Sequence, residues 1–287
     1  MQSASVILLL ALVASVSCYR CTSTGNVNVT ANGKQPINGQ FPHHALLESD
    51  FAEGKRYCSG AMVSRQFVLT VAQCVQGATT VKVTLGANCL LEGGDNKYRY
   101  TFTALEYFVK EGFSDETFEN DVAMVQFTDE EVRLPPWVAP VALPAVDEQH
   151  VSEEVFTSGY GLLSFSAESA ADSLQFLKLT VLDYEQCQDE FQFVTPESGQ
   201  FCAQREDAQP NCVSDVGSPL VVKRKGYMKY TLLGLTSFGQ KFACSFGNPG
   251  ALQEVRAHVE WVQSFLEDGE EVSTTPATTD AGPEEDY

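Results

Sequence analysis

Residues 67–74 read Phe67-Val68-Leu69-Thr70-Val71-Ala72-Gln73-Cys74, and residues 212–220 read Cys212-Val213-Ser214-Asp215-Val216-Gly217-Ser218-Pro219-Leu220. A third block, Asn120-Asp121-Val122-Ala123-Met124-Val125, lies between them in the chain. Each block contains a short apolar run rich in β-branched residues, which predicts buried strands over 66–72, 121–127 and 219–222. The remaining runs at 81–85, 98–108, 174–182 and 230–237 are separated by Gly, Asn and Pro turns, which indicates an all-β protein.

The three blocks resemble, in order, the V-L-T-A-A-H-C, N-D-I-A-L and C-x-G-D-S-G-G-P-L blocks of the chymotrypsin- and trypsin-like serine proteases (the S1 family). Gly159-Tyr160-Gly161 and Pro249-Gly250 resemble two further family elements, and the likeness covers residues 30–266. It implies two six-stranded antiparallel Greek-key β-barrels with a C-terminal helix. Apolar residues at helical spacing place that helix over Glu254–Leu266.

The resemblance places three residues at the catalytic positions of the family. Gln73 stands at the general base, Val216 at the nucleophile, and only the acid, Asp121, is retained. A carboxamide neither takes nor returns a proton near neutral pH, and valine has no atom that attacks a carbonyl. We therefore expect a catalytically inactive homologue, and the resemblance favours an arthropod source. Asp121 keeps a structural role as acceptor for the Gln73 amide and the Ser237 hydroxyl.

No neighbouring residue takes over the chemistry. Ser214 and Ser218 flank Val216 by two residues on either side, where neither reaches the position of the missing serine. None of the histidines lies in a block that matches the catalytic base; they are His43, His44, His150 and His258. Ser214 also replaces the family glycine whose N–H is one oxyanion donor, which leaves the geometry of that donor open.

The specificity pocket and the activation site also depart from the family pattern. Pro210 stands where a trypsin places the aspartate that binds basic side chains, while Ser237 and Gly239 match the pocket wall with Phe238 in place of tryptophan. The wall therefore predicts a partly apolar cleft, or only a vestige of one.

Activation in the family frees an isoleucine ammonium that pairs with the aspartate before the nucleophile. Here Thr30 stands at the isoleucine position, Val29 precedes it, and Asp215 is retained. Because a buried carboxylate needs a partner, Asp215 implies either an open, zymogen-like loop or a different partner.

Composition limits the partners. The chain has 287 residues, a formal net charge of −20 and a pI near 4.4, which argues against nucleic acid or an anionic membrane. The apolar run at 5–17 ends in small residues, so residues 1–18 are expected to form a secretory signal peptide, cut on either side of Cys18. No other stretch is long enough to span a bilayer, and the histidine spacing predicts no metal site and no cofactor.

Nine cysteines in a secreted chain predict disulfides. The resemblance implies Cys58–Cys74, Cys187–Cys202 and Cys212–Cys244. If Cys18 leaves with the signal peptide, Cys21 and Cys89 remain to pair with each other. The alternative is Cys18–Cys21, with Cys89 free or intermolecular. Asn28-Val29-Thr30 is the N-glycosylation sequon, in the polar segment 19–29.

The C-terminal segment differs from the rest in composition. Residues 267–287 carry eight acidic residues and no Lys or Arg, and they are expected to form a disordered tail. Tyr287 directly follows three carboxylates, a context that favours tyrosine sulfation, and the Thr-rich approach favours O-glycosylation.

Two functions are therefore weighed, with an active endopeptidase as a remote third. The first is a secreted, non-catalytic homologue that binds a protein partner, a cascade protease or its zymogen, in immunity, melanisation or clotting. The second is a salivary or secreted inhibitor of host clotting or complement proteases that acts through its cleft or its acidic tail.

Overall fold

The computed structural model describes residues 34–90, 98–130, 132–146, 154–161, 173–205, 215–224, 230–239 and 248–266. Several predictions fall outside these residues: the signal peptide, the 19–29 segment with Asn28, the acidic tail with Tyr287, and the positions of Cys21, Val29, Thr30, Pro210, Cys212, Ser214 and Cys244. The boundaries expected at residues 18, 29 and 266 stay predictions. No helix among the described residues is both long and apolar enough to cross a membrane.

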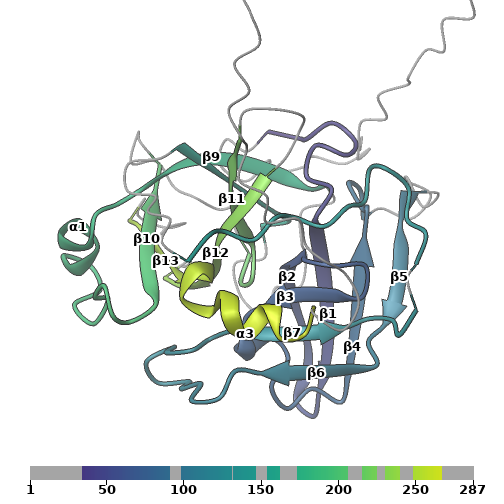
Figure 1. Ribbon diagram of the computed structural model, residues 1–287, viewed down its shortest axis with the longest axis horizontal. Coiled ribbons are helices and arrows are strands. Elements are labelled where there is room, and N and C mark those ends of the chain that lie inside the picture. The colour runs from purple at the N-terminus through teal and green to yellow at the C-terminus, as the bar shows by residue number, and fades with distance from the viewer. Residues whose placement is uncertain are drawn as a thin grey trace, which may run out of the picture.

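The first half of the chain forms one antiparallel sheet of seven strands in the order β5-β4-β1-β2-β3-β7-β6 (Figure 1). Its strands are β1 His44–Phe51, β2 Gly54–Met62, β3 Phe67–Thr70, β4 Thr80–Leu85, β5 Tyr100–Thr103, β6 Glu106–Val109 and β7 Ala123–Gln126. Inward-facing side chains alternate along β4, as expected for a sheet with one face on a core.

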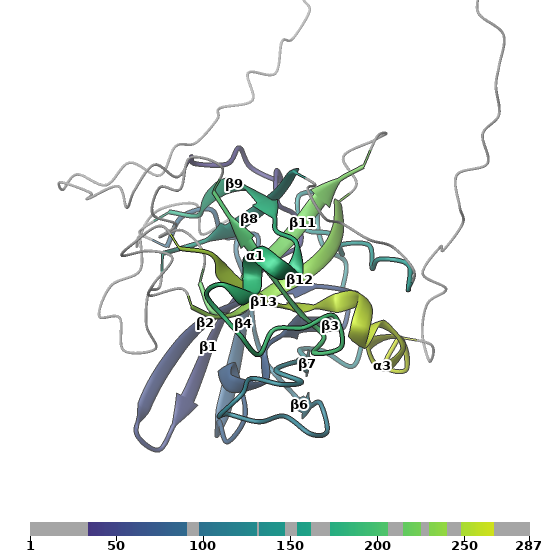
Figure 2. The ribbon, with the colours of Figure 1, turned by 90° about the vertical axis from the view of Figure 1, so that its left-hand side faces the viewer.

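The second half forms a closed six-stranded barrel in the order β10-β13-β12-β11-β8-β9. Its strands are β8 Glu154–Gly159, β9 Gln175–Val181, β10 Gln200–Gln204, β11 Pro219–Lys223, β12 Tyr230–Phe238 and β13 Gly250–Glu254. A short helix, α1 Tyr184–Gln188, precedes β10, and Asp183 caps its first turn. Figure 2 shows this barrel with α1 in front and the β1–β2 hairpin of the first sheet extending below it.

The all-β fold with two barrel-like sheets is confirmed, with two corrections of detail. The strand expected over 98–108 is two strands, because β5 pairs with β4 whereas β6 pairs with β7. The change of partner falls between Ala104, which bonds to β4, and Leu105, which bonds to β7. Since β5 and β6 are the two ends of the first sheet, this short connection brings those ends together. The helix expected over Glu254–Leu266 is a 3-10 turn, Val255–His258, followed by α3 Val259–Gln263, because Glu254 still belongs to β13.

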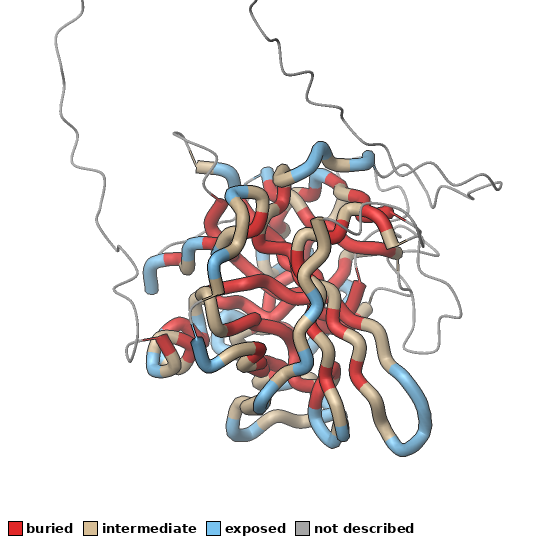
Figure 3. The backbone as a smooth tube through the Cα atoms, turned by 90° about the vertical axis from the view of Figure 1, so that its right-hand side faces the viewer, coloured by how far each residue is buried: buried red, intermediate tan, exposed pale blue. Residues whose placement is uncertain are grey.

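One core joins the two halves. Buried residues of the first sheet share a cluster with Val216, Val221, Leu232 and Leu235 of the second half. The C-terminal turns pack across this junction, since the Phe265 ring lies 6.0 Å from Phe67 and 5.0 Å from Phe108. Figure 3 shows the buried residues concentrated inside the two sheets and the exposed ones at the hairpin ends.

Two of the disulfides that the resemblance implies are present among the described residues. Cys58–Cys74 joins β2 to the turn after β3, and Cys187–Cys202 joins α1 to β10. Cys89 is also disulfide-bonded, so the alternative of a free Cys89 thiol is wrong, and its partner lies outside the described residues. Buried bridges of this loop length stabilise a fold by about 2–4 kcal/mol.

Candidate functional site

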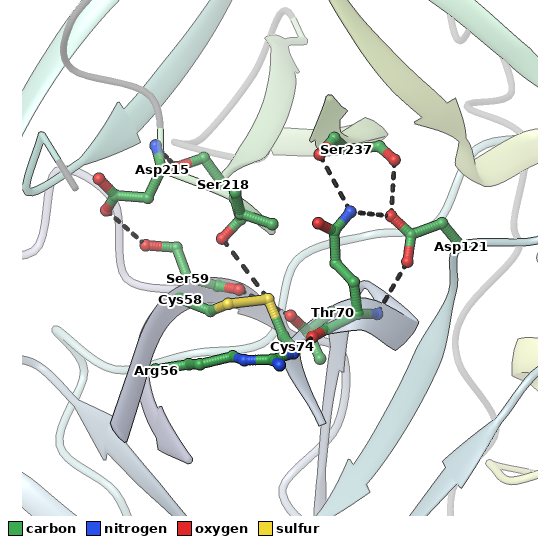
Figure 4. The surroundings of a disulfide bond; sticks show 11 residues. Arg56, Cys58, Ser59, Thr70, Cys74, Asp121, Asp215, Ser218 and Ser237 are labelled. Atoms are coloured by element: carbon green, nitrogen blue, oxygen red, sulfur yellow. Dashed lines mark hydrogen bonds between the residues drawn. A yellow bond between two sulfur atoms is a disulfide. The ribbon is translucent and has the colours of Figure 1, made fainter. Parts of the chain in front are cut away.

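The site begins where β3 ends. After Thr70 the chain enters a 3-10 turn, Ala72–Cys74, which aims Gln73 toward the loop that carries Asp121. The Gln73 backbone N–H donates to Asp121 Oδ1 at 2.9 Å. Cys74 holds the end of the turn through its disulfide to Cys58 (Figure 4). Gln73 is therefore fixed by its backbone before its side chain makes any contact.

The Gln73 side chain closes a three-residue cluster that we call the amide cluster: Gln73, Asp121 and Ser237. Gln73 Nε2 donates to Asp121 Oδ2 and, at 3.0 Å, to the Ser237 carbonyl. Ser237 Oγ donates to Asp121 Oδ2 at 2.6 Å (Figure 4). The two donors predicted for Asp121, the Gln73 amide and the Ser237 hydroxyl, therefore both bind its carboxylate. Both N–H groups of the Gln73 amide are thereby satisfied.

Asp121 is fully buried, and it follows Asn120, whose φ of 53° lies in the left-handed region. Burial raises the pKa of its carboxyl group, while the donors Ser237 and Gln73 oppose that rise. No histidine among the described residues hydrogen-bonds Asp121. Asp121 therefore accepts hydrogen bonds from Gln73 and Ser237 and from no histidine of the described residues.

Val216 lies in the turn that the sequence matched to the nucleophile loop. Its carbonyl accepts the Ser59 N–H at 2.8 Å, and its side chain joins the core with 9% of its surface exposed. Gly217 follows with φ 81°, and a Cβ there would lie 2.1 Å from the Ser59 carbonyl oxygen. Only glycine lets the turn dock this closely on β2.

Asp215 begins the same turn and is fully buried. Its Oδ2 accepts from Ser59 Oγ at 2.9 Å, and its own N–H donates to Ser218 Oγ at 2.7 Å (Figure 4). The same Oδ2 accepts from the Tyr160 N–H at 2.7 Å. The sequence left open whether Asp215 lies in an open loop or has a partner other than a freed ammonium. The structure has other partners for Asp215, Ser59 and the Tyr160 N–H. Sequence reasoning missed Ser59 and Tyr160, because neither spacing nor composition links them to Asp215.

The wall segment that the sequence matched at 237–239 carries an aromatic cluster that was not predicted. Phe238 stacks on Phe118 with ring centroids 5.1 Å apart, and the Phe191 and Phe193 rings lie 5.2 Å and 5.4 Å from it. Gly239 has φ 79°, and a Cβ there would lie 2.7 Å from the Phe191 ring. We call Phe118, Phe191, Phe193 and Phe238 the phenylalanine cluster.

Phe118 is held in an unusual conformation. Its φ of 54° is rare for a bulky residue, and its carbonyl accepts from Gln200 Nε2 at 2.8 Å and from Gln253 Nε2 at 2.7 Å. Gln253 also lies 3.4 Å from Ser237 Oγ, which ties this segment to the amide cluster. No group of three or more His, Cys, Asp or Glu in the described part of the chain could hold a metal ion.

The fold and the buried aspartate beside the end of β3 define a domain of serine protease architecture. The family model for trypsin matches residues 30–262, and the chain belongs to the trypsin family.

The relatives include several arthropod proteases. The chain is 29% identical over 232 residues to brachyurin of Leptuca pugilator, covering 81% of this chain and 96% of that protein. It is 26% identical to the CLIP domain-containing serine protease B4 of Anopheles gambiae, covering 82% of this chain and 69% of that protein. Among solved structures it is similar to a collagenase, with a TM-score of 0.69, 24% identity and coverage of 83% and 98%, which shows the fold alone.

Proposed function

We propose that this chain is a secreted, non-catalytic member of the trypsin family that acts by binding a protein partner. The amide cluster carries the proposal. Gln73 stands where the family has its base, and its amide already donates to Asp121 and to the Ser237 carbonyl. Secretion rests on the expected signal peptide and on the disulfides, which form and persist in oxidising compartments.

Two substitutions at the matched catalytic positions, Gln73 and Val216, would each prevent catalysis. Acyl transfer needs a nucleophile and a base that shuttles its proton, and removing either alone costs nearly as much as removing both. Val216 supplies no nucleophile, and Gln73 supplies no base. Ser59 and His44 also lie 3.3 Å apart, but both are buried, and the Ser59 hydroxyl donates to Asp215 at 2.9 Å.

Active-site labelling tests the loss of catalysis. The purified chain should not react with a fluorophosphonate probe or turn over peptide and ester substrates. Residual labelling from a contaminating protease is checked with the same preparation after repurification. Labelling that survives and maps to Ser218 or Ser214 would overturn the proposal.

Phe193, the exposed member of the phenylalanine cluster, marks the surface that we assign to the partner. Phe193 is 49% exposed and packs on Phe238, so it offers an aromatic face to a second molecule. Aromatic side chains at the centre of interfaces carry a large share of binding energy.

The segments that supply three of these rings are acidic. Residues 111–120 and 183–204 hold no Lys or Arg, and their nine carboxylates are all exposed: Glu111, Asp115, Glu116, Glu119, Asp183, Glu185, Asp189, Glu190 and Glu197. A basic segment of a partner fits this combination, since acidic residues steer it and Arg or Lys stacks on aromatic faces. A cascade protease or zymogen is the partner class that we infer, and the likeness to a CLIP domain-containing protease supports it.

Affinity capture from the body fluid of the source organism tests the partner. The wild-type chain should retain a protease or zymogen that Phe193→Ser loses. Leu105→Ser is the matched control, because Leu105 is a 58% exposed apolar residue between β5 and β6. Equal recovery by Phe193→Ser and Leu105→Ser would remove the assignment of this surface. A vertebrate clotting or complement factor as the specific partner would favour the inhibitor alternative.

A further inference from the structure

A buried chain of hydrogen bonds runs from β8 through β1 and β2 to the turn at 215–218. Ser158 Oγ lies 2.9 Å from His44 Nδ1, His44 Nε2 lies 3.3 Å from Ser59 Oγ, and Ser59 Oγ lies 2.9 Å from Asp215 Oδ2. All four residues are at most 4% exposed. Groups buried to this degree are satisfied by one another rather than by bulk water.

The direction of each hydrogen bond in this buried series follows from the fact that Asp215 accepts from Ser59. An ionised carboxylate only accepts, so the single Ser59 hydroxyl hydrogen is committed to Asp215. Ser59 Oγ can then only accept from His44, which places a hydrogen on Nε2 and leaves Nδ1 to accept from Ser158. A neutral imidazole suits this role, and burial together with nearby His43 lowers the pKa of His44 to about 3.

Ser59 holds the turn through its backbone as well. Its N–H donates to the Val216 carbonyl at 2.8 Å, and its own carbonyl, which accepts from Thr70 Oγ1 at 2.7 Å, faces Gly217. The Gly217 N–H donates to the Thr236 carbonyl at 2.7 Å. The 215–218 turn is thus bound to β2 and β12, and Asp215 is its charged contact to Ser59.

We propose that His44 and Ser59 are positioning residues that hold Asp215 from inside the folded domain, so that the 215–218 turn is fixed in the uncut chain. In the family pattern an ammonium freed by cleavage binds this aspartate, whereas here Val29, and not Lys or Arg, directly precedes Thr30. The proposal goes beyond the binding function and does not depend on it.

Hydrogen–deuterium exchange measured by mass spectrometry tests this in the full chain. Intact mass first verifies that the amino terminus has not been cut between residues 18 and 40. The wild-type turn should already be protected in that uncut chain. A turn that exchanges freely until the chain is cut would overturn the proposal.

The variants test the two positioning residues. Ser59→Ala removes one oxygen and should speed exchange at 215–218 by about 10-fold or more relative to β7, because a hydrogen bond to a buried charge is lost. His44→Leu should do the same. His44→Gln keeps a donor in the place of Nε2 and should stay within about threefold of wild type.

His43→Leu is the matched control. His43 is 1% exposed, and its Nε2 has no hydrogen-bond partner in the described part of the chain. Its loss should weaken the whole domain without a selective effect at 215–218. Equal acceleration of the turn and of β7 in Ser59→Ala, or no acceleration of the turn, would overturn the proposal. Since Ser59→Ala removes a single atom, the measurement stands even if His44→Leu does not fold.

Discussion

Asp121 and Asp215 are two fully buried carboxylates on neighbouring loops, and the chain satisfies them in different ways. Asp121 is bound by Gln73 and Ser237, a side chain that replaced the family base and one that the family pattern shares. Asp215 is bound by Ser59, which lies outside the matched blocks, and by the N–H of Tyr160 in the matched Gly159-Tyr160-Gly161 segment. Asp121 therefore keeps Ser237, a residue of the family pattern, and has Gln73 in place of the family base. Asp215 instead has a side-chain donor, Ser59, that lies outside the matched blocks.

The Cys58–Cys74 disulfide connects the two sites. Cys58 precedes Ser59, which binds Asp215, and Cys74 follows Gln73, which binds Asp121 (Figure 4). The comparison teaches that the residue bound to Asp121 and the order of the 215–218 turn are separate properties. One carboxylate can lose its catalytic partner while the other keeps the loop in place.

The largest expected effect comes from restoring the chemistry. Gln73→His with Val216→Ser should label with a fluorophosphonate probe at least about 1000-fold faster than either single variant, because base and nucleophile act as a unit. Peptide turnover should remain low, since Ser214 and Pro210 still depart from the family pattern. Labelling rates are followed by gel fluorescence.

The outcome of that experiment tests the turn at Asp215 separately from the residue bound to Asp121. Labelling of the double variant supports a turn that is already ordered around Asp215. No labelling, although the variant is folded by circular dichroism, would contradict an ordered turn. Peptide cleavage at the rate of an active relative would contradict the expected effect of Ser214 and Pro210.

The disulfide that links the sites gives the next largest effect. Cys58→Ala with Cys74→Ala should lower the free energy of unfolding by about 3 kcal/mol, since the bridge closes a loop of about 15 residues. Urea denaturation measures the loss. The matched control is Cys187→Ala with Cys202→Ala, which removes a bridge that touches neither carboxylate. Its sequence separation is 15, against 16 for Cys58–Cys74. Faster exchange at 215–218 only in the first variant would show that this bridge supports the sites.

Acid should act on the chain through its buried histidines. Burial lowers the pKa of His43 and His44 to about 3, and that of His258 to about 4. The unfolded chain binds these protons more readily, so stability is full above about pH 6.5 and falls as pH drops toward the folded values. Each histidine should cost about 2 kcal/mol between pH 7 and pH 5. Urea midpoints at the two pH values should differ less in His44→Gln than in wild type, and an equal difference would contradict a neutral, buried His44.

The sequence predicted one of these sites well and the other only in outline. Gln73, Asp121 and Ser237 lie in or beside blocks with a fixed spacing, so their contacts follow from the resemblance. The side-chain donor to Asp215 is Ser59 on β2, more than 150 residues away in the chain, and His44 on β1 contacts Ser59 in turn. Neither residue type nor periodicity marks a buried serine as the donor to a distant carboxylate. The phenylalanine cluster was missed for a similar reason, since the left-handed backbone at Phe118 is set by tertiary contacts from Gln200 and Gln253.

The smallest expected effect compares the two carboxylates directly. Ser237→Ala and Ser59→Ala each delete one hydroxyl that donates to a buried Oδ2, at 2.6 Å and 2.9 Å respectively. Each should lower the free energy of unfolding by about 2 kcal/mol, the cost of losing a hydrogen bond to a charged group. Ser59→Ala should cost slightly more, because His44 Nε2 loses its acceptor at the same time. Urea denaturation of both single variants and the double variant measures the costs and their sum.

The double variant decides whether the two sites are independent. The two hydroxyls bind different carboxylates and share no partner, so their costs should add to within about 0.5 kcal/mol. Besides the Cys58–Cys74 disulfide, the hydrogen bond from the Gly217 N–H to the Thr236 carbonyl beside Ser237 links the two sites. Coupling well above that limit would mean that the buried carboxylates form one network joined at this contact. The chain would then be unable to lose chemistry at one site without disturbing the turn at the other.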